Sequence, residues 1–165
     1  MTDTTATSAH SGGESTFVPP DFSVPTTFVH DEFHLTPLRP EHNPDDYRAW
    51  TSSKEHIRRT PGFEHYGWPV DMTIEENRRD LVQHADDFTR RVGFTYSVIS
   101  GEEVIGCVYI YPDDKPGHAQ VRSWVREDRA QLDVVLYELV DEWLRDVWPF
   151  KGYSYSPRTR ELSRY

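Results

Sequence analysis

The stretch that decides the fold runs from Val104 to Arg158 and reads VIGCVYIYPDDKPGHAQVRSWVREDRAQLDVVLYELVDEWLRDVWPFKGYSYSPR. Its apolar run Val104–Tyr111 is nearly continuous, which predicts a strand buried on both faces. Gly106 interrupts that run, which predicts a β-bulge or a close approach by another segment. A turn at 112–117 then leads to the next strand of a meander at 118–125.

The same stretch continues into a helix and ends in a short strand. Apolar residues recur at helical spacing from Leu132 to Val147 while charged residues fill the opposite face, so we expect a surface helix packed on a sheet. A last strand is expected at 153–156. The preceding strand ends in Val125-Arg126 and leads into the helix N-terminus, where unpaired N–H groups and the helix dipole favour an anion.

Two helical regions are expected before the meander. Asn43 is a good N-cap and predicts a helix that runs past Trp50, followed by a short helix at 53–58. Thr73 and Glu76 have the spacing of a capping box, which opens a later helix. The inner face of that later helix is expected to carry Ile74, Leu81, Val82 and Phe88. The remaining strands are expected at 32–38 and 94–99.

Length and composition indicate one domain with a single core. The chain has 165 residues, of which 36% are hydrophobic and 13% aromatic. The low hydrophobic share is typical of polar tails around an ordinary core. We therefore expect a disordered tail at 1–20, a single domain at 21–157 and a loose tail at 158–165.

The charge balance and the single cysteine restrict the partners and the compartment. The formal charge is −10, from 18 basic and 28 acidic residues, which argues against general binding to nucleic acid or to an anionic membrane surface. No apolar stretch approaches the roughly 18 residues of a membrane span. Cys107 has no intrachain partner for a disulfide, and the N-terminus lacks a signal-peptide pattern, so we expect a cytoplasmic protein.

The predicted order is strand, two helices, a three-strand meander, helix and strand, and it resembles the GNAT family of N-acetyltransferases. Phe33–Pro40 is similar to the first strand of that family and Val104–Ile110 to its third. Trp124–Arg126 and the following helix are similar to its fourth strand and its cofactor-binding helix. The resemblance covers about 33–157. It implies an α/β (α+β) fold with a mixed, mostly antiparallel sheet and helices on both faces.

The resemblance also implies a site for acetyl-CoA as acyl donor. The pantetheine arm would lie in the splay between the fourth and fifth strands and pair with the backbone of Trp124 and Val125. The pyrophosphate would lie on the loop that begins at Arg126. This loop departs from the family pattern because Arg129 stands where a glycine is usual. Two alternatives stay open: Arg129 blocks the close approach that glycine allows, or its guanidinium binds phosphate bidentately.

The resemblance places one wall of the acceptor site in the loop between the early helices. Phe63, Tyr66 and Trp68 of that loop can bind an apolar or cationic amine, or they can close the core. The acceptor would be a small-molecule or peptide amine.

No catalytic acid or base is assigned from the sequence. Tyr153 and Tyr155 on the last strand could reach the splay, but strand tyrosines are more often packing residues. His118 begins the fourth strand, where a solvent histidine beside a turn is the favoured interpretation.

A metal site is not expected. His30 and His34 are four apart with acidic residues between them, as in zinc proteases, but that chemistry needs a helix. The alternating pattern and Pro37 favour a strand, on which the two rings would lie roughly 13 Å apart.

The sequence thus predicts an N-acetyltransferase that moves an acetyl or other acyl group from acyl-CoA to an amine. The alternative is a catalytically inactive GNAT-like binding or interaction module. The shortened C-terminus leaves the last strand, 151–156, as an exposed edge, which predicts a homodimer through that strand.

Overall fold

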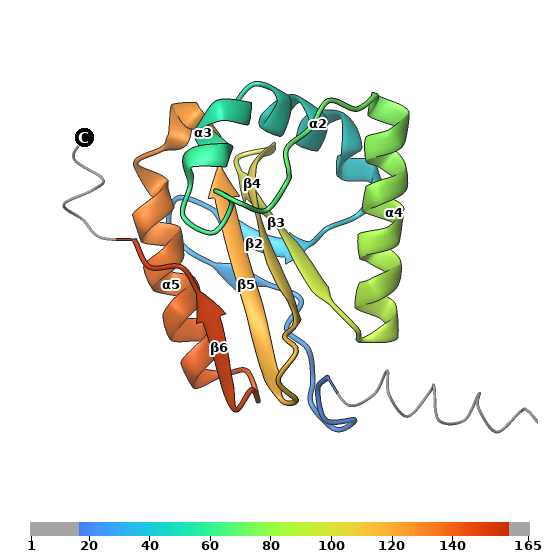
Figure 1. The fold of residues 1–165 in the computed structure, drawn as a ribbon, viewed down its shortest axis with the longest axis vertical. Helices are drawn as coiled ribbons and strands as arrows, with labels where there is room; N and C mark the ends of the chain where they lie inside the picture. The colour runs from blue at the N-terminus through green and yellow to red at the C-terminus, as the bar shows by residue number, and fades with distance from the viewer. Residues whose placement is uncertain (1–16, 159–165) are drawn as a thin grey trace, which may run out of the picture.

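A six-stranded sheet forms the centre of the computed structural model, which describes residues 17–158 (Figure 1). The strands follow one another across the sheet in chain order. Neighbours from β1 to β5 are antiparallel, and β6 is parallel to β5. Their bounds are β1 Phe28–Val29, β2 His34–Pro37, β3 Phe94–Ser100, β4 Glu103–Pro112, β5 His118–Val125 and β6 Gly152–Tyr155.

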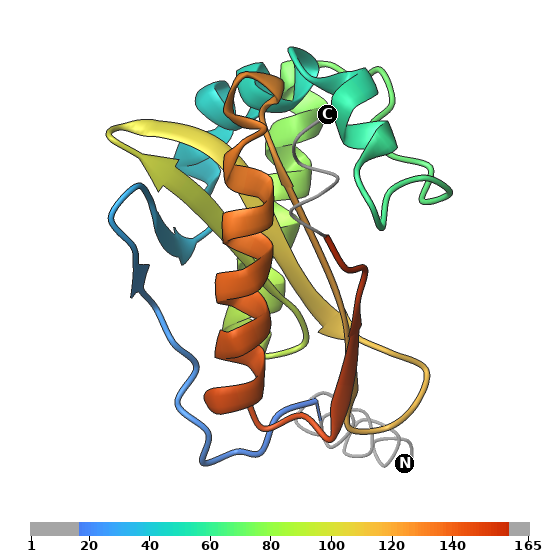
Figure 2. The ribbon, with the colours of Figure 1, turned by 90° about the vertical axis from the view of Figure 1, so that its left-hand side faces the viewer.

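Helices cover both faces of this sheet. Figures 1 and 2 show α5 on one face and α2, α3 and α4 on the other. This arrangement confirms the predicted α/β fold with a mostly antiparallel sheet. The bounds of the helices are η1 Pro40–His42, α2 Asn43–Thr51, α3 Lys54–Arg59, α4 Ile74–Arg90, η2 Glu127–Arg129 and α5 Leu132–Asp146. Among these described helices, none has the length and apolar character that crossing a membrane requires.

Each face of the sheet carries its own hydrophobic core, as expected when helices pack on both sides. On the α5 face the fully or nearly fully buried side chains include Tyr96, Ile110, Leu136 and Trp143. On the opposite face they include Leu38, Trp50, Leu81 and Trp124.

The N-terminal arm belongs to the packed domain. Val18 has no exposed surface, and the ring of Phe17 stacks on Phe150 with centroids 5.2 Å apart. The prediction of a disordered tail at 1–20 is therefore wrong at its C-terminal end, because burying these apolar side chains holds the arm on the sheet. Residues 1–16 lie outside the described part of the chain.

Gly106 is needed for both of the reasons that the sequence suggested. The β3–β4 register shifts between Val98 and Ile99, which makes Ile105 the extra residue of a bulge. A Cβ on Gly106 would lie 2.1 Å from the carbonyl oxygen of Trp124. Any side chain here would force β4 and β5 apart.

The first helix begins where predicted, but not with the predicted cap. His42 is the N-cap residue of α2, because the turn η1 continues into the helix. The Asn43 side chain is buried instead, where it donates to the Ile74 carbonyl (3.1 Å) and accepts from Asn77 Nδ2 (2.7 Å). Asn43 thus ties α2 to α4.

The capping box of α4 is confirmed, but its predicted inner face is partly wrong. Glu76 N–H donates to Thr73 Oγ1 (3.1 Å), and Thr73 N–H donates to Glu76 Oε1 (2.8 Å). Ile74 and Val82 are 37% and 42% exposed. They lie beside the stripe that faces the sheet, which consists of Asn77, Leu81, His84 and Phe88.

Candidate functional site

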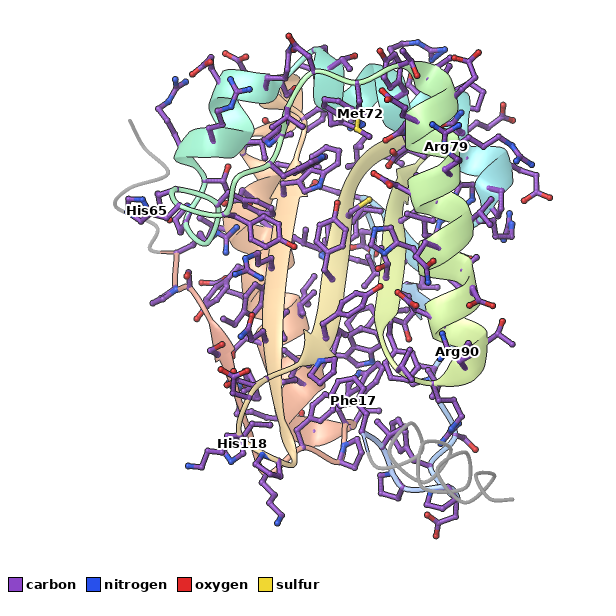
Figure 3. All side chains as sticks on the ribbon, turned by 45° about the vertical axis from the view of Figure 1, so that its right-hand side comes forward. Phe17, His65, Met72, Arg79, Arg90 and His118 are labelled. Atoms are coloured by element: carbon purple, nitrogen blue, oxygen red, sulfur yellow. The ribbon has the colours of Figure 1, made fainter. Side chains whose placement is uncertain are left out.

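A cavity of about 660 Å³ lies on the α4 face of the sheet. Figure 3 shows this face, with α4 on one side, the loop that carries His65 on the other, and rings gathered between them. The site is therefore formed where α4, β4, β5 and the loop 61–71 converge. Its lining includes Asp46, Tyr66, Trp68, Asp80, His84, Asp87, Tyr109, Tyr111, Gln120 and Arg122.

A second cavity, of about 280 Å³, lies where the pairing of β5 and β6 ends. The two parallel strands pair only from His118 to Val121, so they separate beyond that point. The cavity is lined by Gly62, Gln120, Val121, Arg122, Ser154, Tyr155 and Ser156. Gln120 and Arg122 line both cavities, which makes them the boundary between the two.

The backbone N–H and C=O groups of successive residues in β5 point alternately toward β4 and toward this opening. Arg126 N–H donates to the Ile105 carbonyl in β4 (2.8 Å), whereas the Ser123 carbonyl accepts a hydrogen bond from the other side. Because backbone groups alternate along a strand, Trp124 directs its N–H and C=O toward β4, and Val125 directs its own toward the opening. Of the two residues predicted to pair with the pantetheine arm, Val125 thus has its backbone groups on the side of the opening, and Trp124 has them on the side of β4.

Trp124 instead has a structural role on the cavity face. Its side chain is fully buried, and its Nε1 donates to the hydroxyl of Tyr109 (2.9 Å). Burial raises the pKa of that Tyr109 hydroxyl. Trp124 therefore fixes a tyrosine that lines the cavity.

The loop before α5 holds its arginines in ion pairs. Arg126 Nε donates to Asp128 Oδ1 (3.0 Å) and its Nη1 to Glu103 Oε1 (3.3 Å), and the pKa of the guanidinium is raised by these partners. Arg129 Nη1 donates to Ser100 Oγ (3.3 Å). Both arginines predicted to hold a phosphate thus stand at the same loop, and each already has a partner.

One backbone donor of that loop is also occupied. Glu127 N–H donates to the hydroxyl of Ser53 (2.9 Å), the residue that precedes α3. Ser53 is buried, so α3 covers this side of the loop.

Arg158 fills the inner end of the opening between β5 and β6. It is 7% exposed, and its Nη2 donates to the Ser123 carbonyl (2.7 Å) while its Nε donates to Asp133 Oδ2 of α5 (3.0 Å). The hydroxyl of Tyr155 forms a hydrogen bond with Ser123 Oγ (2.7 Å) and is buried there. The predicted loose tail at 158–165 is wrong for Arg158, because the charge of this residue is paired inside the domain. Residues 159–165 lie outside the described part.

The aromatic loop contributes two of its three predicted residues to the cavity. Tyr66 and Trp68 line it, whereas Phe63 is 2% exposed and packs beneath both. The Arg122 guanidinium lies 3.9 Å from the centre of the Tyr66 ring and its Nε donates to the Gly62 carbonyl (2.9 Å). Arg122 therefore holds the loop against β5 by a cation–π contact and a hydrogen bond.

A polar network that the sequence did not suggest joins α4 to the sheet. Tyr111 donates its hydroxyl hydrogen to Asp87 Oδ2 (2.8 Å), and the Tyr111 hydroxyl oxygen lies 2.8 Å from His84 Nδ1. Thr95 Oγ1 lies 3.1 Å from that nitrogen. Burial lowers the pKa of His84, although Asp87 and Asp80 oppose the shift.

Asp46 is a buried carboxyl on the same cavity. It accepts from Asn77 Nδ2 (3.0 Å) and from the thiol of Cys107 (3.5 Å). Burial raises the pKa of Asp46 to about 6, and the hydrogen bonds from Asn77 and Cys107 act in the opposite direction.

The cavity carries an excess of negative charge. Asp46, Asp80 and Asp87 face it, against one cation, Arg122, whose guanidinium is engaged with the loop 61–71. Three tyrosines and a tryptophan add ring faces that also favour a cation. The lining therefore favours a positively charged ligand with an apolar body.

Two further residues that the sequence offered, His118 and Tyr153, line neither cavity. His118 stands at the start of β5, packed beside Gly152, at the end of the sheet far from Met72 (Figure 3). Tyr153 donates its hydroxyl to Asp141 (2.7 Å). Within residues 17–158, no group of His, Cys, Asp and Glu side chains has the arrangement of a metal site.

No family model matches the sequence, and no curated protein matches it. Solved structures do match. A ribosomal-protein alanine acetyltransferase from Vibrio fischeri aligns with a TM-score of 0.58 and 11% identity, over 73% of this chain and 67% of that one. The microcin self-immunity acetyltransferase MccE, in complex with acetyl-CoA and AMP, aligns with a TM-score of 0.56 and 14% identity, over 76% of this chain and 71% of that one.

The ribosomal-protein α-N-acetyltransferase RimL, solved with coenzyme A, gives a TM-score of 0.55 and 17% identity. This chain covers 67% of the length of RimL in that complex and 64% of its length in the apo structure. The similarity extends over 72% of this chain. The chain therefore has the fold of the GNAT family of N-acetyltransferases.

Proposed function

We propose that the protein is a GNAT-type N-acyltransferase that moves an acetyl or other acyl group from acyl-CoA to an amine. The observation that carries this proposal is the meeting of two cavities at Gln120 and Arg122. One lies in the strand opening, as a donor site requires, and the other is acidic and aromatic, as an acceptor site for a cationic amine requires. MccE and RimL, which share the fold, were solved with acetyl-CoA and coenzyme A.

The residues around the opening fit an acyl-CoA. The opening is lined largely by polar atoms, and the Val125 backbone is turned toward it, which suits an amide-bearing pantetheine arm. Arg126 and Arg129 supply two guanidinium groups for a pyrophosphate in place of glycine N–H groups. Binding requires Arg129 to turn from Ser100, and Arg158 to leave the Ser123 carbonyl.

When bound, the acyl donor supplies an activated thioester carbonyl and a thiolate leaving group. The chain contributes position and polarity. Val125 N–H would hold the carbonyl oxygen as a fixed backbone donor. Tyr66 and Trp68 would hold the acceptor in the cavity, where a fixed approach replaces the entropy of a chance encounter.

The acceptor that best suits the cavity is a cationic amine. The three aspartates attract an ammonium group, and the ring faces of Tyr66 and Trp68 suit its apolar or cationic body. Both a small-molecule amine and the amino terminus of a peptide satisfy this chemistry.

Thermal shift and thiol release test the proposal together. Acetyl-CoA at about 100 times its Kd should stabilise the protein by about 2.7 kcal/mol, which raises Tm by roughly 5–10 °C. ATP provides a control for unspecific phosphate binding. Thiol release is then measured with diamines and basic N-terminal peptides, against neutral alcohols. No shift at millimolar acetyl-CoA and no thiol release would overturn the proposal.

An inactive binding module is the second candidate. It is favoured by the ion pairs of Arg126 and by the Arg158 contact, which both occupy groups that a donor would need. A thermal shift without thiol release from any amine would support it. Replacing Arg129 with Gly separates the two roles of that residue, because affinity for CoA rises if the side chain blocks the loop and falls if it binds phosphate.

A further inference from the structure

The network on α4 fixes the position of the hydrogen on His84. A phenol carries one hydrogen, and that of Tyr111 is donated to the Asp87 carboxylate, which can only accept. The Tyr111 oxygen must therefore accept from His84 Nδ1, 2.8 Å away. The histidine thus carries its hydrogen on Nδ1 and a lone pair on Nε2.

The Nε2 atom of His84 is accessible in the cavity. The hydrogen bonds of this ring to the described residues are both made by Nδ1, to Tyr111 and Thr95. Nε2 has no such partner but is not fully buried, so it retains exposed surface. His84 itself lines the cavity. A lone pair on an open, oriented nitrogen is what a general base requires.

We propose that His84 is the general base that deprotonates the amine acceptor, directly or through one water molecule. The proposal rests on the proposed function and adds a catalytic residue to it. The arrangement follows the logic of other catalytic histidines, in which a carboxylate orients the ring that takes the proton. Here the carboxylate of Asp87 acts through the hydroxyl of Tyr111, and both are positioning residues.

The position of His84 suits this role. Its ring lies beside that of Tyr109, with centroids 5.7 Å apart, and Tyr109 is paired across the sheet with Arg122. Arg122 marks the boundary of the two cavities. An amine held between Tyr66 and α4 therefore has the base on one side and the donor opening on the other.

The groups around His84 suit both the neutral and the protonated form of its ring. Burial lowers the pKa of His84, so the ring is a free base at neutral pH. The charged groups near it are Asp80 and Asp87 on α4, with Asp46 and Arg122 elsewhere on the cavity wall, and Tyr109, Tyr111 and Thr95 face it from the sheet. The two α4 carboxylates stabilise the imidazolium that forms when the proton arrives.

The proton balance is complete without a further reactant. The ammonium N–H bond breaks, its electron pair stays on the nitrogen, and the proton binds Nε2. The free amine then attacks the thioester carbon, and the C–S bond breaks. Over the whole reaction the acceptor ammonium loses two protons: one protonates the departing thiolate, and the other passes through His84 to solvent.

The test combines kinetics with a measurement that needs no substrate. Replacing His84 with Gln should lower kcat by about 10²-fold or more while the acceptor KM changes little. Activity of the natural protein should fall as pH drops below the ordinary histidine value of about 6.5, since the protonated ring cannot accept. H84Q should lose this acid limb. The matched control is His118→Gln, which removes a histidine that lines neither cavity.

Nitrogen NMR of the ring supplies the independent measurement. In the free protein at neutral pH, we expect a hydrogen on Nδ1 and none on Nε2, and Tyr111→Phe should produce a mixture of the two forms. A hydrogen on Nε2 in the natural protein would overturn the proposal.

The two proposals fail in different ways. A protein that neither binds acetyl-CoA nor releases thiol contradicts the proposed function. A protein that is active, but whose H84Q variant keeps both kcat and the acid limb, contradicts only the role of His84.

Discussion

The buried carboxyl of Asp46 makes stability depend on pH in an unusual direction. Most paired carboxylates have lowered pKa values and stabilise a fold at neutral pH, whereas burial raises the pKa of Asp46 to about 6. The protonated form favours the folded state. The stabilisation that comes from protonating Asp46 in the folded state is therefore complete below the ordinary aspartate pKa of about 3.9, and it is lost as pH rises through 6.

We expect Asp46→Asn to gain stability relative to the natural protein as pH rises. The free energy of unfolding of the variant minus that of the natural protein should increase by about 2.5 kcal/mol between pH 4 and pH 8. Urea unfolding at both pH values measures this change. The control is Asp114→Asn, which makes the same substitution at an exposed turn. A difference that does not vary with pH would contradict the assignment.

Several residues of the site could not be found from the sequence because their roles depend on partners far along the chain. His84 and Tyr111 are separated by 27 positions and meet only because α4 packs on β4. Each has an ordinary interpretation alone, as a helix histidine and a strand tyrosine. Phe63 shows the converse, since a ring in a predicted binding loop is used to pack the core.

The helices and strands were predictable wherever apolar periodicity was strong. The meander, α5 and the capping box of α4 all follow from local pattern and cap chemistry. The inner face of α4 was not fully predictable, because Asn77 and His84 are polar residues on the stripe that meets the sheet. A search for apolar residues alone assigns that stripe to Ile74 and Val82 instead.

The segment after β6 could not be predicted for a different reason. Arg158 follows the last strand without any periodic pattern, and a single arginine near a polar terminus is typical of a solvated tail. Its burial depends on Asp133 of α5 and on the Ser123 carbonyl that the separating strands leave unpaired. These two partners of Arg158 can be identified only from the structure, which shows the opening between β5 and β6.

Arg158 should compete with the acyl donor for this opening. The double variant Arg158→Met, Asp133→Asn removes the guanidinium without leaving an unpaired buried charge. Because a hydrogen bond to a charged group contributes about 1.5–3 kcal/mol, we expect CoA to bind roughly tenfold more tightly or better. Isothermal titration with CoA measures this.

Arg145→Met is the control for that experiment, since Arg145 is paired with Asp141 on the exposed face of α5. Its affinity for CoA should match that of the natural protein. Weaker binding by the double variant would identify Arg158 as a ligand of the donor and contradict its role as a competitor.

At the scale of the whole molecule, the sheet is open on the β6 side. β6 is the last strand in the sheet order, and among residues 17–158 it pairs with β5 alone. Edge strands that retain free backbone groups tend to pair with another chain. The homodimer predicted through Lys151–Ser156 therefore stays a prediction with a definite surface.

A strand of four residues supports only a weak dimer, so association should depend on concentration. We expect size exclusion with light scattering to show a rising mass as the protein is concentrated. Ser154 is exposed on β6, and Ser154→Lys should shift the equilibrium to monomer, because the two-fold axis of such a dimer brings like charges close together. Thr89→Lys adds the same charge on the exposed side of α4 and should leave the mass unchanged. A natural protein that is strictly monomeric at high concentration would contradict the predicted homodimer. It would mean that β6 is too short to pair with a second copy of the chain.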